Sequence, residues 1–308
     1  MIQIRRILCP VDFSEFSRRA LEYAAALSRL YEAELTVLHV RPPSPAVSGL
    51  ERTPSRAVLA PLDGEPLADE LRSLFGETAG QWPTPELRVL SGPVVGTILD
   101  VAVEVNADLV VLGTHGRTGF ERFVLGSVTE KIVRKAPCPV LTVSSRAEDV
   151  PAHALFARIL CGADFSDASG HAVNYALSLA QAAKGRVTLL HVVEPLPNGS
   201  LSKYPEFDLE RYRCGLMKDA RAKLEALVPR DARGSCDRGT RVASGKPYQE
   251  ILRAALEERS DLIVLGVHGH GAVDRMLFGS TTQAVVRQAA CPVLSVRTRP
   301  ATLALQGR

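Results

Sequence analysis

The sequence contains an internal repeat, and this feature limits the possible folds more than any other. Residues 7–40 align with residues 159–192 at an offset of 152, with 15 identical residues in 34. Residues 91–143 align with residues 244–296 at an offset of 153, with 25 identities in 53. Self-similarity at one long offset indicates a duplicated structural unit. The 308 residues therefore predict two homologous domains.

The boundaries of the two domains follow from where the aligned blocks begin and end. We place the first domain at residues 1–146 and the second at residues 158–300. Residues 147–157 contain charged residues and Pro151 and are predicted as the linker, and residues 301–308 as a tail. Each domain then has about 150 residues, which is an ordinary domain size.

Each half shows the same alternation of β-rich and helical patterns. Ser14 and Ser17 offer capping hydroxyls to a helix whose apolar residues recur at helical spacing as far as Leu30. Nearly continuous Val, Ile and Leu strands that alternate with helices predict a parallel sheet covered on both faces. Each half is therefore expected to be a doubly wound α/β domain. In the first half we expect strands at residues 4–11, 35–40, 87–91, 107–113 and 140–143, and further helices at residues 94–104 and 127–135.

The segments between the aligned blocks differ between the halves. Residues 41–66 carry six prolines and predict a loop, which leads to a short helix at residues 67–75. The corresponding loop of the second half leads to a longer helix at residues 209–227.

Composition argues against several classes of protein. A net charge of +3 from 37 basic and 34 acidic residues is too balanced for a nucleic-acid-binding protein, which needs a basic surface. Apolar runs such as residues 109–112 are too short to span a bilayer, and Asp12 interrupts the N-terminal run before a signal-peptide core could form. Six scattered cysteines without a CxxC pair suit reduced thiols, most of them in the core. We expect a cytoplasmic protein with no membrane or nucleic-acid partner.

A glycine loop follows the strand at residues 107–113 and recurs in the second half. It reads Gly113-Thr-His-Gly116, then nine residues, then Gly126-Ser127; the second copy runs from Gly266 to Ser280 at the same spacing. Glycines permit close approach of the backbone to a ligand, and N–H groups at a helix N-terminus favour an anion. Open parallel sheets bind ligands at such strand ends. A phosphate site is therefore one interpretation, and a plain structural turn, copied by duplication, is the other.

These motifs together resemble the universal stress protein family. The resemblance rests on the VDFS-type first strand, the LHV second strand, the G-x-x-G-x9-G-[ST] loop and the C-P-V final strand. The chain is similar to tandem members of the branch that binds ATP. The resemblance implies Rossmann-like domains of the adenine nucleotide alpha hydrolase type, with one adenine nucleotide site per domain. The ligand would be ATP with Mg²⁺, and AMP or ADP are the alternatives.

The resemblance also implies which residues form each site. In the first half Asp12 and Val40 would contact the ribose and adenine, and Asp12 would help to hold Mg²⁺. Residues Gly113, His115 and Gly116 would line this site, and Gly126, Ser127 and Thr129 would hold the phosphates. The same roles in the second half would belong to Asp164, which would also hold Mg²⁺, and to Val192, Gly266, His268, Gly269, Gly279, Ser280 and Thr282.

Elementary chemistry leaves an alternative for several of these residues. Asp12 ends the first strand, where its carboxylate would either accept from ribose hydroxyls or cap the next helix. His115 would donate to a phosphate or pack the loop. His39 and His191 end buried strands and are expected to be core histidines. The second site is expected to be weaker or differently selective for two reasons. Gly162-Ala163 replaces Pro10-Val11 and removes bulk beside the expected adenine pocket, and His270-Gly271-Ala272 replaces Arg117-Thr118-Gly119 with more glycine and less charge.

Three classes of function fit the sequence. The first is a regulatory protein of the stress response, in which bound ATP stabilises one conformation or one surface for an unidentified protein partner. The second is a slow ATP hydrolase or adenylate-handling enzyme; against it, the loop lacks the P-loop lysine and no paired carboxylates are evident. The third is a ligand-free scaffold. The resemblance further implies that residues 139–143 and 292–296 pair within the chain in a pseudo-twofold arrangement, with a homodimer as a further level of assembly.

Overall fold

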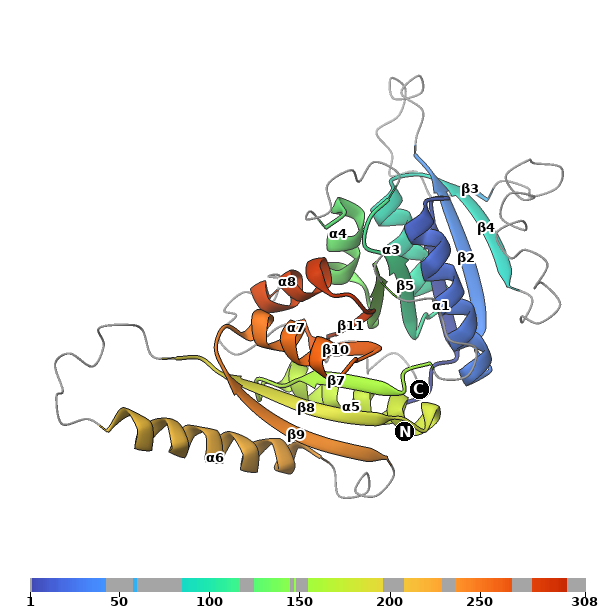
Figure 1. Ribbon diagram of the computed structural model, residues 1–308. Helices are drawn as coiled ribbons and strands as arrows, with labels where there is room; N and C mark the ends of the chain where they lie inside the picture. Colours follow the sequence, from blue (N-terminus) through green and yellow to red (C-terminus); the bar gives the residue numbers. More distant parts are fainter. Residues whose placement is uncertain are drawn as a thin grey trace, which may run out of the picture. The chain divides into compact units, whose positions relative to one another are not determined.

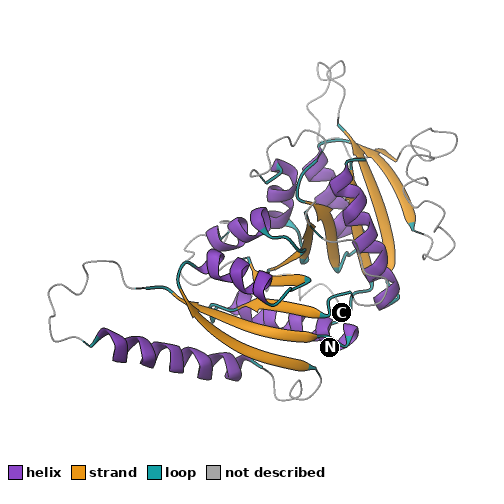
Figure 2. Cartoon of the chain, in the orientation of Figure 1, coloured by secondary structure: helices purple, strands orange, loops and turns teal. Residues whose placement is uncertain are grey.

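The computed structural model divides into two compact units, residues 3–155 (unit 1) and residues 156–298 (unit 2). The residues that the structure describes are 2–42, 58–59, 85–116, 125–144, 147, 155–195, 208–228, 236–267 and 279–297. In both units helices alternate with strands along the chain (Figure 2). The predicted helix at residues 67–75 lies outside the described residues.

Unit 1 contains a sheet with the strand order β3-β4-β2-β1-β5-β6 (Figure 1). Its pairs are parallel, apart from β3 with β4, which is antiparallel. The elements are β1 (Arg6–Val11), α1 (Glu15–Tyr31), β2 (Glu34–Arg41), β3 (Val58–Leu59), β4 (Glu86–Ser91), α3 (Val94–Glu104), β5 (Leu109–Gly113), α4 (Ser127–Lys135) and β6 (Val140–Val143).

Unit 2 repeats this arrangement with the strand order β11-β10-β7-β8-β9, and its strand pairs are parallel. Its elements are β7 (Arg158–Gly162), α5 (Asp167–Ala183), β8 (Arg186–Val193), α6 (Leu209–Leu227), β9 (Asp237–Ser244), α7 (Pro247–Glu257), β10 (Leu262–Gly266), α8 (Ser280–Gln288) and β11 (Val293–Val296). The two units thus confirm the predicted doubly wound α/β fold.

The winding of unit 1 follows from its connections. From β1 the chain passes through α1 to β2 on one side, and from β4 it passes through α3 to β5 on the other. Because such crossovers are right-handed, α1 and the contacting pair α3 and α4 cover opposite faces (Figure 1). The interior strand β5, between β1 and β6, is buried along its whole length, as its run of apolar residues predicts.

Three local expectations differ from the structure. The buried strand β5 begins at Leu109 instead of residue 107. The first strand begins at Arg6 instead of residue 4, because the backbone N–H groups of Arg5 and Arg6 donate to Oδ2 of Asp108 at 2.9 and 3.0 Å. Within the proline-rich segment at residues 41–66, predicted as a loop, Val58–Leu59 forms the short strand β3. Two residues are too few to show a strand period in a sequence.

Candidate functional site

The candidate site of unit 1 lies where the strand order changes direction. From β1 the sheet extends to β2 on one side and to β5 on the other, so the loops after β1 and β5 leave the same carboxyl edge on opposite faces. Residues from both loops and from the first turn of α4 meet at this edge. The corresponding edge in unit 2 lies at the ends of β7 and β10.

A tight turn joins β1 to α1 and is held by Asp12. Its Oδ1 accepts from the backbone N–H of Ser14 at 3.1 Å and from the Ser14 hydroxyl at 2.6 Å. The intervening Phe13 has a left-handed backbone, with φ of 64°. Ser14 is the N-cap of α1, and its Oγ accepts from the N–H of Ser17. The alternative that Asp12 caps the helix is therefore wrong: Asp12 positions the residue that does.

Unit 2 builds the same turn from its own Asp-Phe-Ser sequence. Oδ1 of Asp164 accepts from the N–H of Ser166 at 3.0 Å and from its hydroxyl at 2.5 Å. Phe165 also has φ of 64°, and Ser166 caps α5. The two aspartates therefore have the same position relative to their helices.

The strand-end histidines pack as their positions predict. Nδ1 of His39 lies 2.9 Å from the carbonyl oxygen of Val11, and its ring lies 4.7 Å from that of Phe13. In unit 2, His191 makes the equivalent contacts, at 2.8 Å to the carbonyl of Ala163 and 4.3 Å to the ring of Phe165. Both histidines are half-buried and hold the turn after the first strand, which is a structural role.

The first glycine of the loop is required by packing. A Cβ added at Gly113 would lie 2.7 Å from Cβ of Phe16 and 2.9 Å from its backbone carbonyl, so α1 approaches β5 closely only because residue 113 is glycine. Gly266 has the same role in unit 2, where a Cβ would lie 2.8 Å from the backbone carbon of Ala168. Gly113 and Gly266 therefore allow the helix after the first strand of each unit to pack closely against the strand that ends at the candidate site.

The two threonines predicted to hold phosphates bind the backbone instead. Oγ1 of Thr129 donates to the carbonyl of Gly113 at 2.8 Å, and Oγ1 of Thr282 donates to that of Gly266 at 2.9 Å. Both side chains are buried. Each hydroxyl has one proton, and here it is already donated. These bonds tie the helix to the end of the strand, and they leave neither hydroxyl a proton to donate to a phosphate.

Asp12, the loop after β5 and the start of α4 come together at Gly116 and Gly126. A Cβ added at Gly116 would lie 2.6 Å from Oδ2 of Asp12, and one added at Gly126 would lie 3.4 Å from Cα of His115. The N–H of Gly126 donates to the carbonyl of Thr114 at 2.9 Å. The predicted residues Asp12, His115, Gly116 and Gly126 thus form one cluster.

His115 contributes a polar atom that has no partner within the described part of the chain. Its Nδ1 lies 3.0 Å from the Thr114 hydroxyl, and its ring lies 5.1 Å from that of Phe16. Its Nε2 is buried and has no hydrogen-bond partner among the described residues. Such an atom is costly unless a ligand or water binds it. His115 therefore packs within the loop, and its Nε2 is a buried polar atom that a ligand or a water molecule would satisfy.

The start of α4 offers backbone donors. Its N-cap is Gly126, which provides no capping side chain, and Ser127 is its first residue. The first N–H groups of a helix need a partner, and the helix dipole favours an anion there. In unit 2, Gly279 and Ser280 begin α8 in the same way, and the N–H of Gly279 donates to the carbonyl of Val267 at 3.1 Å.

The remaining predicted residues are only partly placed. Val40 follows His39, the register partner of Val11, so Val40 and Asp12 lie beside each other at the strand ends. Val40 is buried and Val192 is half-buried. His268 and Gly269 lie outside the described residues.

Gly162 does not enlarge the second site, contrary to the expectation from the sequence. A Cβ added there would lie 2.6 Å from Cδ2 of Leu265 and 3.5 Å from Cδ1 of Ile251. These two side chains already fill the space that the proline of the first half would need. A difference between the two sites therefore has to come from other residues.

Within the described part of the chain, no group of three or more His, Cys, Asp or Glu side chains could hold a metal ion. A magnesium ion at Asp12 or Asp164 would thus depend on phosphate oxygens and water for most of its ligands. In the same residues, no helix is long and apolar enough to cross a membrane.

Comparison with known families agrees with the duplicated motifs. Residues 3–144 and residues 155–297 each match the model of the universal stress protein family. The chain belongs to the universal stress protein family. It contains two copies of the universal stress protein domain in tandem, and the resemblance inferred from the sequence is confirmed.

Individual universal stress proteins match either one domain or the whole chain. One from Thermus aquaticus is 38% identical over 145 residues, which are 46% of this chain and all of that protein. One from Mycolicibacterium smegmatis is 28% identical over 302 residues, which are 95% of this chain and 97% of that protein. The crystal structure of one from Archaeoglobus fulgidus has a TM-score of 0.66 and 23% identity, and covers 96% of this chain and 99% of its own. The Archaeoglobus fulgidus protein thus shares the fold of both domains.

Sequence reasoning missed the turn that positions the site in both universal stress protein domains. It identified Asp12 and Ser14 separately, whereas the structure joins them through Oδ1 of the aspartate. The signal was present, because Asp-Phe-Ser occurs at the end of the first strand in both halves. Asp and Ser at this spacing are typical of side chains that bond to a nearby backbone N–H group.

Proposed function

We propose that each domain binds an adenine nucleotide, ATP in the first instance, and that the bound nucleotide regulates the protein. The observation that carries the proposal is the cluster at the carboxyl edge of unit 1. There the Asp12 carboxylate lies beside Gly116, and His115, whose Nε2 is buried without a partner among the described residues, lies beside Gly126 at the uncapped start of α4. The family membership supports the proposal, and so does the repetition of the aspartate and helix start in unit 2.

Each part of the cluster suits a different part of a nucleotide. Asp12 would accept hydrogen bonds from the ribose hydroxyls, and Val40 beside it would contact the adenine. His115, Gly116, Gly126 and Ser127 would bind the phosphates through Nε2, backbone N–H groups and the serine hydroxyl. Mg²⁺ bound to the nucleotide would neutralise phosphate charge, and Asp12 is the carboxylate placed to help hold it. In unit 2, Asp164, Val192, Gly279 and Ser280 are the described residues with these roles.

Regulation requires more than binding. A ligand shifts a conformational equilibrium only by the difference in its affinity for the two states. We therefore expect nucleotide to stabilise one conformation of the protein, or one surface for a protein partner, and to remain intact while it does so.

The experiment is a binding titration of purified, nucleotide-free protein with ATP, in which heat release gives affinity and stoichiometry. We expect two sites per chain. Asp12→Asn should lower the affinity of the first site for ATP by about tenfold, because a charged acceptor becomes a neutral one. The amide oxygen of asparagine can still accept from the Ser14 N–H, so the turn should survive. Asp164→Asn is the matched variant for the second site.

A long incubation with ATP completes the test. Bound ATP that stays intact supports a regulatory role, whereas steady release of ADP would make the protein an ATP hydrolase. Failure of both ATP and ADP to bind would overturn the proposal and leave a ligand-free scaffold. Gly113→Val is unsuitable for this test, because its side chain would collide with the backbone of Phe16 and disturb the fold.

A further inference from the structure

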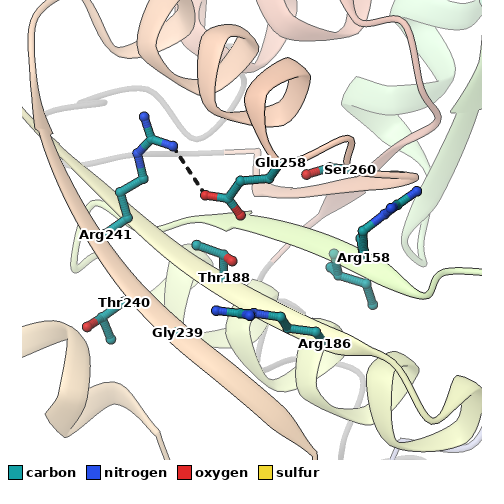
Figure 3. Close-up of a pocket in the computed structure, with 9 residues that line it drawn as sticks. Arg158, Arg186, Thr188, Gly239, Thr240, Arg241, Glu258 and Ser260 are labelled. Carbon is teal, nitrogen blue, oxygen red and sulfur yellow. Dashed lines mark hydrogen bonds and ion pairs between the residues drawn. The ribbon is translucent and has the colours of Figure 1, made fainter.

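A cavity with several charged and hydroxyl-bearing lining residues lies in unit 2, at the opposite edge of the sheet from the candidate nucleotide site. Its volume is about 500 Å³, which is within the usual range for a small-ligand site. It is formed by the first residues of β7 and β8, the first half of β9 and the chain that follows α7 (Figure 3). The lining residues are Arg158, Ile159, Arg186, Thr188, Gly239, Thr240, Arg241, Glu258 and Ser260.

In unit 1 a carboxylate occupies the corresponding place. Glu86 lies beside Thr36 in the register of β2 and β4, and its Oε2 accepts from the Thr36 hydroxyl at 3.3 Å. Its Oε1 lies 2.8 Å from Nε of Arg88, whose Nη1 in turn lies 2.8 Å from Oε1 of Glu104. Thr36, Glu86 and Arg88 thus form one hydrogen-bonded group, with the Glu86 carboxylate in the middle.

Unit 2 keeps the threonine and the arginine but lacks this carboxylate. Thr188 corresponds to Thr36 and Arg241 to Arg88, while Gly239 lies beside Thr188 where unit 1 has Glu86. A Cβ added at Gly239 would lie 3.1 Å from Nη2 of Arg186, so this guanidinium reaches the space of the missing side chain. Figure 3 shows Arg186 extended along its strand toward Gly239.

The positive charge around the gap is also greater in unit 2. At the start of the strands, unit 1 pairs Arg6 with Glu34 in register, whereas unit 2 pairs Arg158 with Arg186. Like charges on neighbouring strands repel each other and favour an anion between them. Nη1 of Arg186 forms an ion pair with Oδ2 of Asp237 at 3.7 Å, and both of these side chains are exposed.

Arg241 has other carboxylate partners in place of the one that is missing. Its Nη2 lies 2.5 Å from Oε2 of Glu257, the counterpart of Glu104, and its Nη1 lies 3.3 Å from Oε1 of Glu258 (Figure 3). Unit 1 has a valine, Val105, at the position of Glu258. Glu258 thus replaces the bond that Glu86 makes to the arginine, and it also lines the cavity. Arg186 reaches the place beside Thr188 that Glu86 fills in unit 1, and Arg158 lines the cavity beside Ser260 (Figure 3).

We propose that this cavity binds a small organic acid, whose carboxylate takes the place beside Thr188 that the Glu86 carboxylate holds in unit 1. Arg186 and the Thr188 hydroxyl would bind that carboxylate. Arg158, which borders the cavity next to Ser260, would attract a second acidic group of the same ligand (Figure 3). A dicarboxylate of the size of succinate is therefore the simplest fitting class. The proposal is independent of nucleotide binding, because it uses residues at the other edge of the sheet.

The test titrates the full-length protein with succinate and, separately, with succinamide, its uncharged analogue, at constant ionic strength. Heat release and the rise in melting temperature are the readouts. We expect succinate to bind at one site per chain and succinamide not to bind. Arg186→Gln should weaken succinate binding by about tenfold or more, because it removes a charged donor. Arg213→Gln, the same change on the exposed face of α6, should leave binding unchanged.

Gly239→Glu gives the sharpest variant, because it places the carboxylate of unit 1 into unit 2. It should abolish succinate binding and raise the melting temperature of the free protein above that of Gly239→Gln, which fills the same space without charge. The end of the Arg186 side chain can move to admit either residue. Equal binding of succinate to wild type and Gly239→Glu would overturn the proposal. So would equal stabilisation by succinate and succinamide, or binding of orthophosphate without binding of succinate.

Discussion

Two glycines of one motif can have different physical reasons to be glycine. Gly113 is close to the backbone of α1, which cannot move without displacing the helix. Gly116 faces Oδ2 of Asp12, the end of a side chain that belongs to the candidate site. The pattern G-x-x-G in the sequence does not distinguish these cases, because a pattern does not show which atoms approach the missing Cβ. The structure assigns the first glycine to packing and the second to the site.

The cysteines also show that residue type alone does not determine where a residue lies in the structure. Most of the six cysteines were expected in the core, but only Cys9, Cys138 and Cys161 are buried. Cys214 is exposed on α6, and the remaining two are half-buried. Cysteine is apolar enough for a core and small enough for a surface, so its type alone does not decide its place.

The buried thiols predict a loss of stability at alkaline pH. Burial raises the pKa of Cys161 from 9.0 to about 12 and also raises the pKa of Cys9. Above pH 9 the unfolded chain loses these protons while the folded chain keeps them, so the free energy of unfolding falls as pH rises toward 12. The slope is at most about 1.4 kcal/mol per pH unit for each thiol. Urea unfolding at several values between pH 8 and 10.5 measures it.

Variants assign this slope to particular thiols. Cys161→Ala should lower the stability at every pH, because it leaves a cavity, but should make the decline above pH 9 less steep. Cys214→Ala should leave the slope unchanged, since Cys214 is exposed. If the slopes of wild type and Cys161→Ala coincide, the buried thiol is not the cause of the alkaline loss.

At the scale of elements, the capped turn after the first strand is the feature that most directly positions the site. Oγ of Ser14 accepts from the Ser17 N–H at 3.2 Å and donates to Asp12, so one hydroxyl serves both the helix and the carboxylate. Ser166 does the same for α5, with Ser169 and Asp164 as its partners. Loss of this hydroxyl should therefore affect stability and the aspartate together.

We predict that Ser14→Ala destabilises unit 1 by about 1 to 2 kcal/mol, the usual cost of losing an N-cap. Ser14→Thr should retain most of the stability, because threonine also caps helices. Thermal unfolding of the three proteins measures the difference. A result in which alanine and threonine are equally harmful would show that packing, and not the hydroxyl, matters at this position.

The elements themselves were largely predictable, and the reasons are physical. The helices at Val94–Glu104, Ser127–Lys135 and Leu209–Leu227 have the predicted bounds, because apolar spacing and flanking glycine or proline residues mark their ends. The cluster of Asp12 with Gly116 and Gly126 was predicted through family resemblance. The roles of Thr129 and Thr282 were not, because a hydroxyl can donate to a phosphate or to a backbone carbonyl and the sequence is the same.

The cavity in unit 2 could not be predicted from either half alone. It lies where the two halves differ, with Gly239, Arg186 and Glu258 in unit 2 at the positions of Glu86, Glu34 and Val105, while Thr188 and Arg241 match Thr36 and Arg88. Alignment of the two halves shows these differences, but only the register of the strands shows that the lost carboxylate lay beside a threonine. Duplicated domains therefore offer an internal comparison for sites that differ between the copies.

At the scale of the whole molecule, each unit has one outermost strand next to its glycine-loop strand. In the strand order of unit 1 this is β6, beside β5, and in unit 2 it is β11, beside β10. An unpaired strand edge readily pairs with another strand. Because the two edges have related sequences, at residues 140–143 and 293–296, pairing between them would be nearly symmetric.

We predict that these two strands pair within one chain and give a compact, pseudo-twofold molecule. Small-angle scattering of the full-length protein tests this prediction. A compact chain of this length has a radius of gyration of about 19 Å, and two domains on a flexible tether would give a clearly larger value and a broad distance distribution. The measurement should include a concentration series, because a homodimer would also raise the radius but would do so with a doubled scattering mass. A larger radius at monomer mass would show that the strand edges do not meet, and that nucleotide bound in one domain has no shared sheet through which to influence the other.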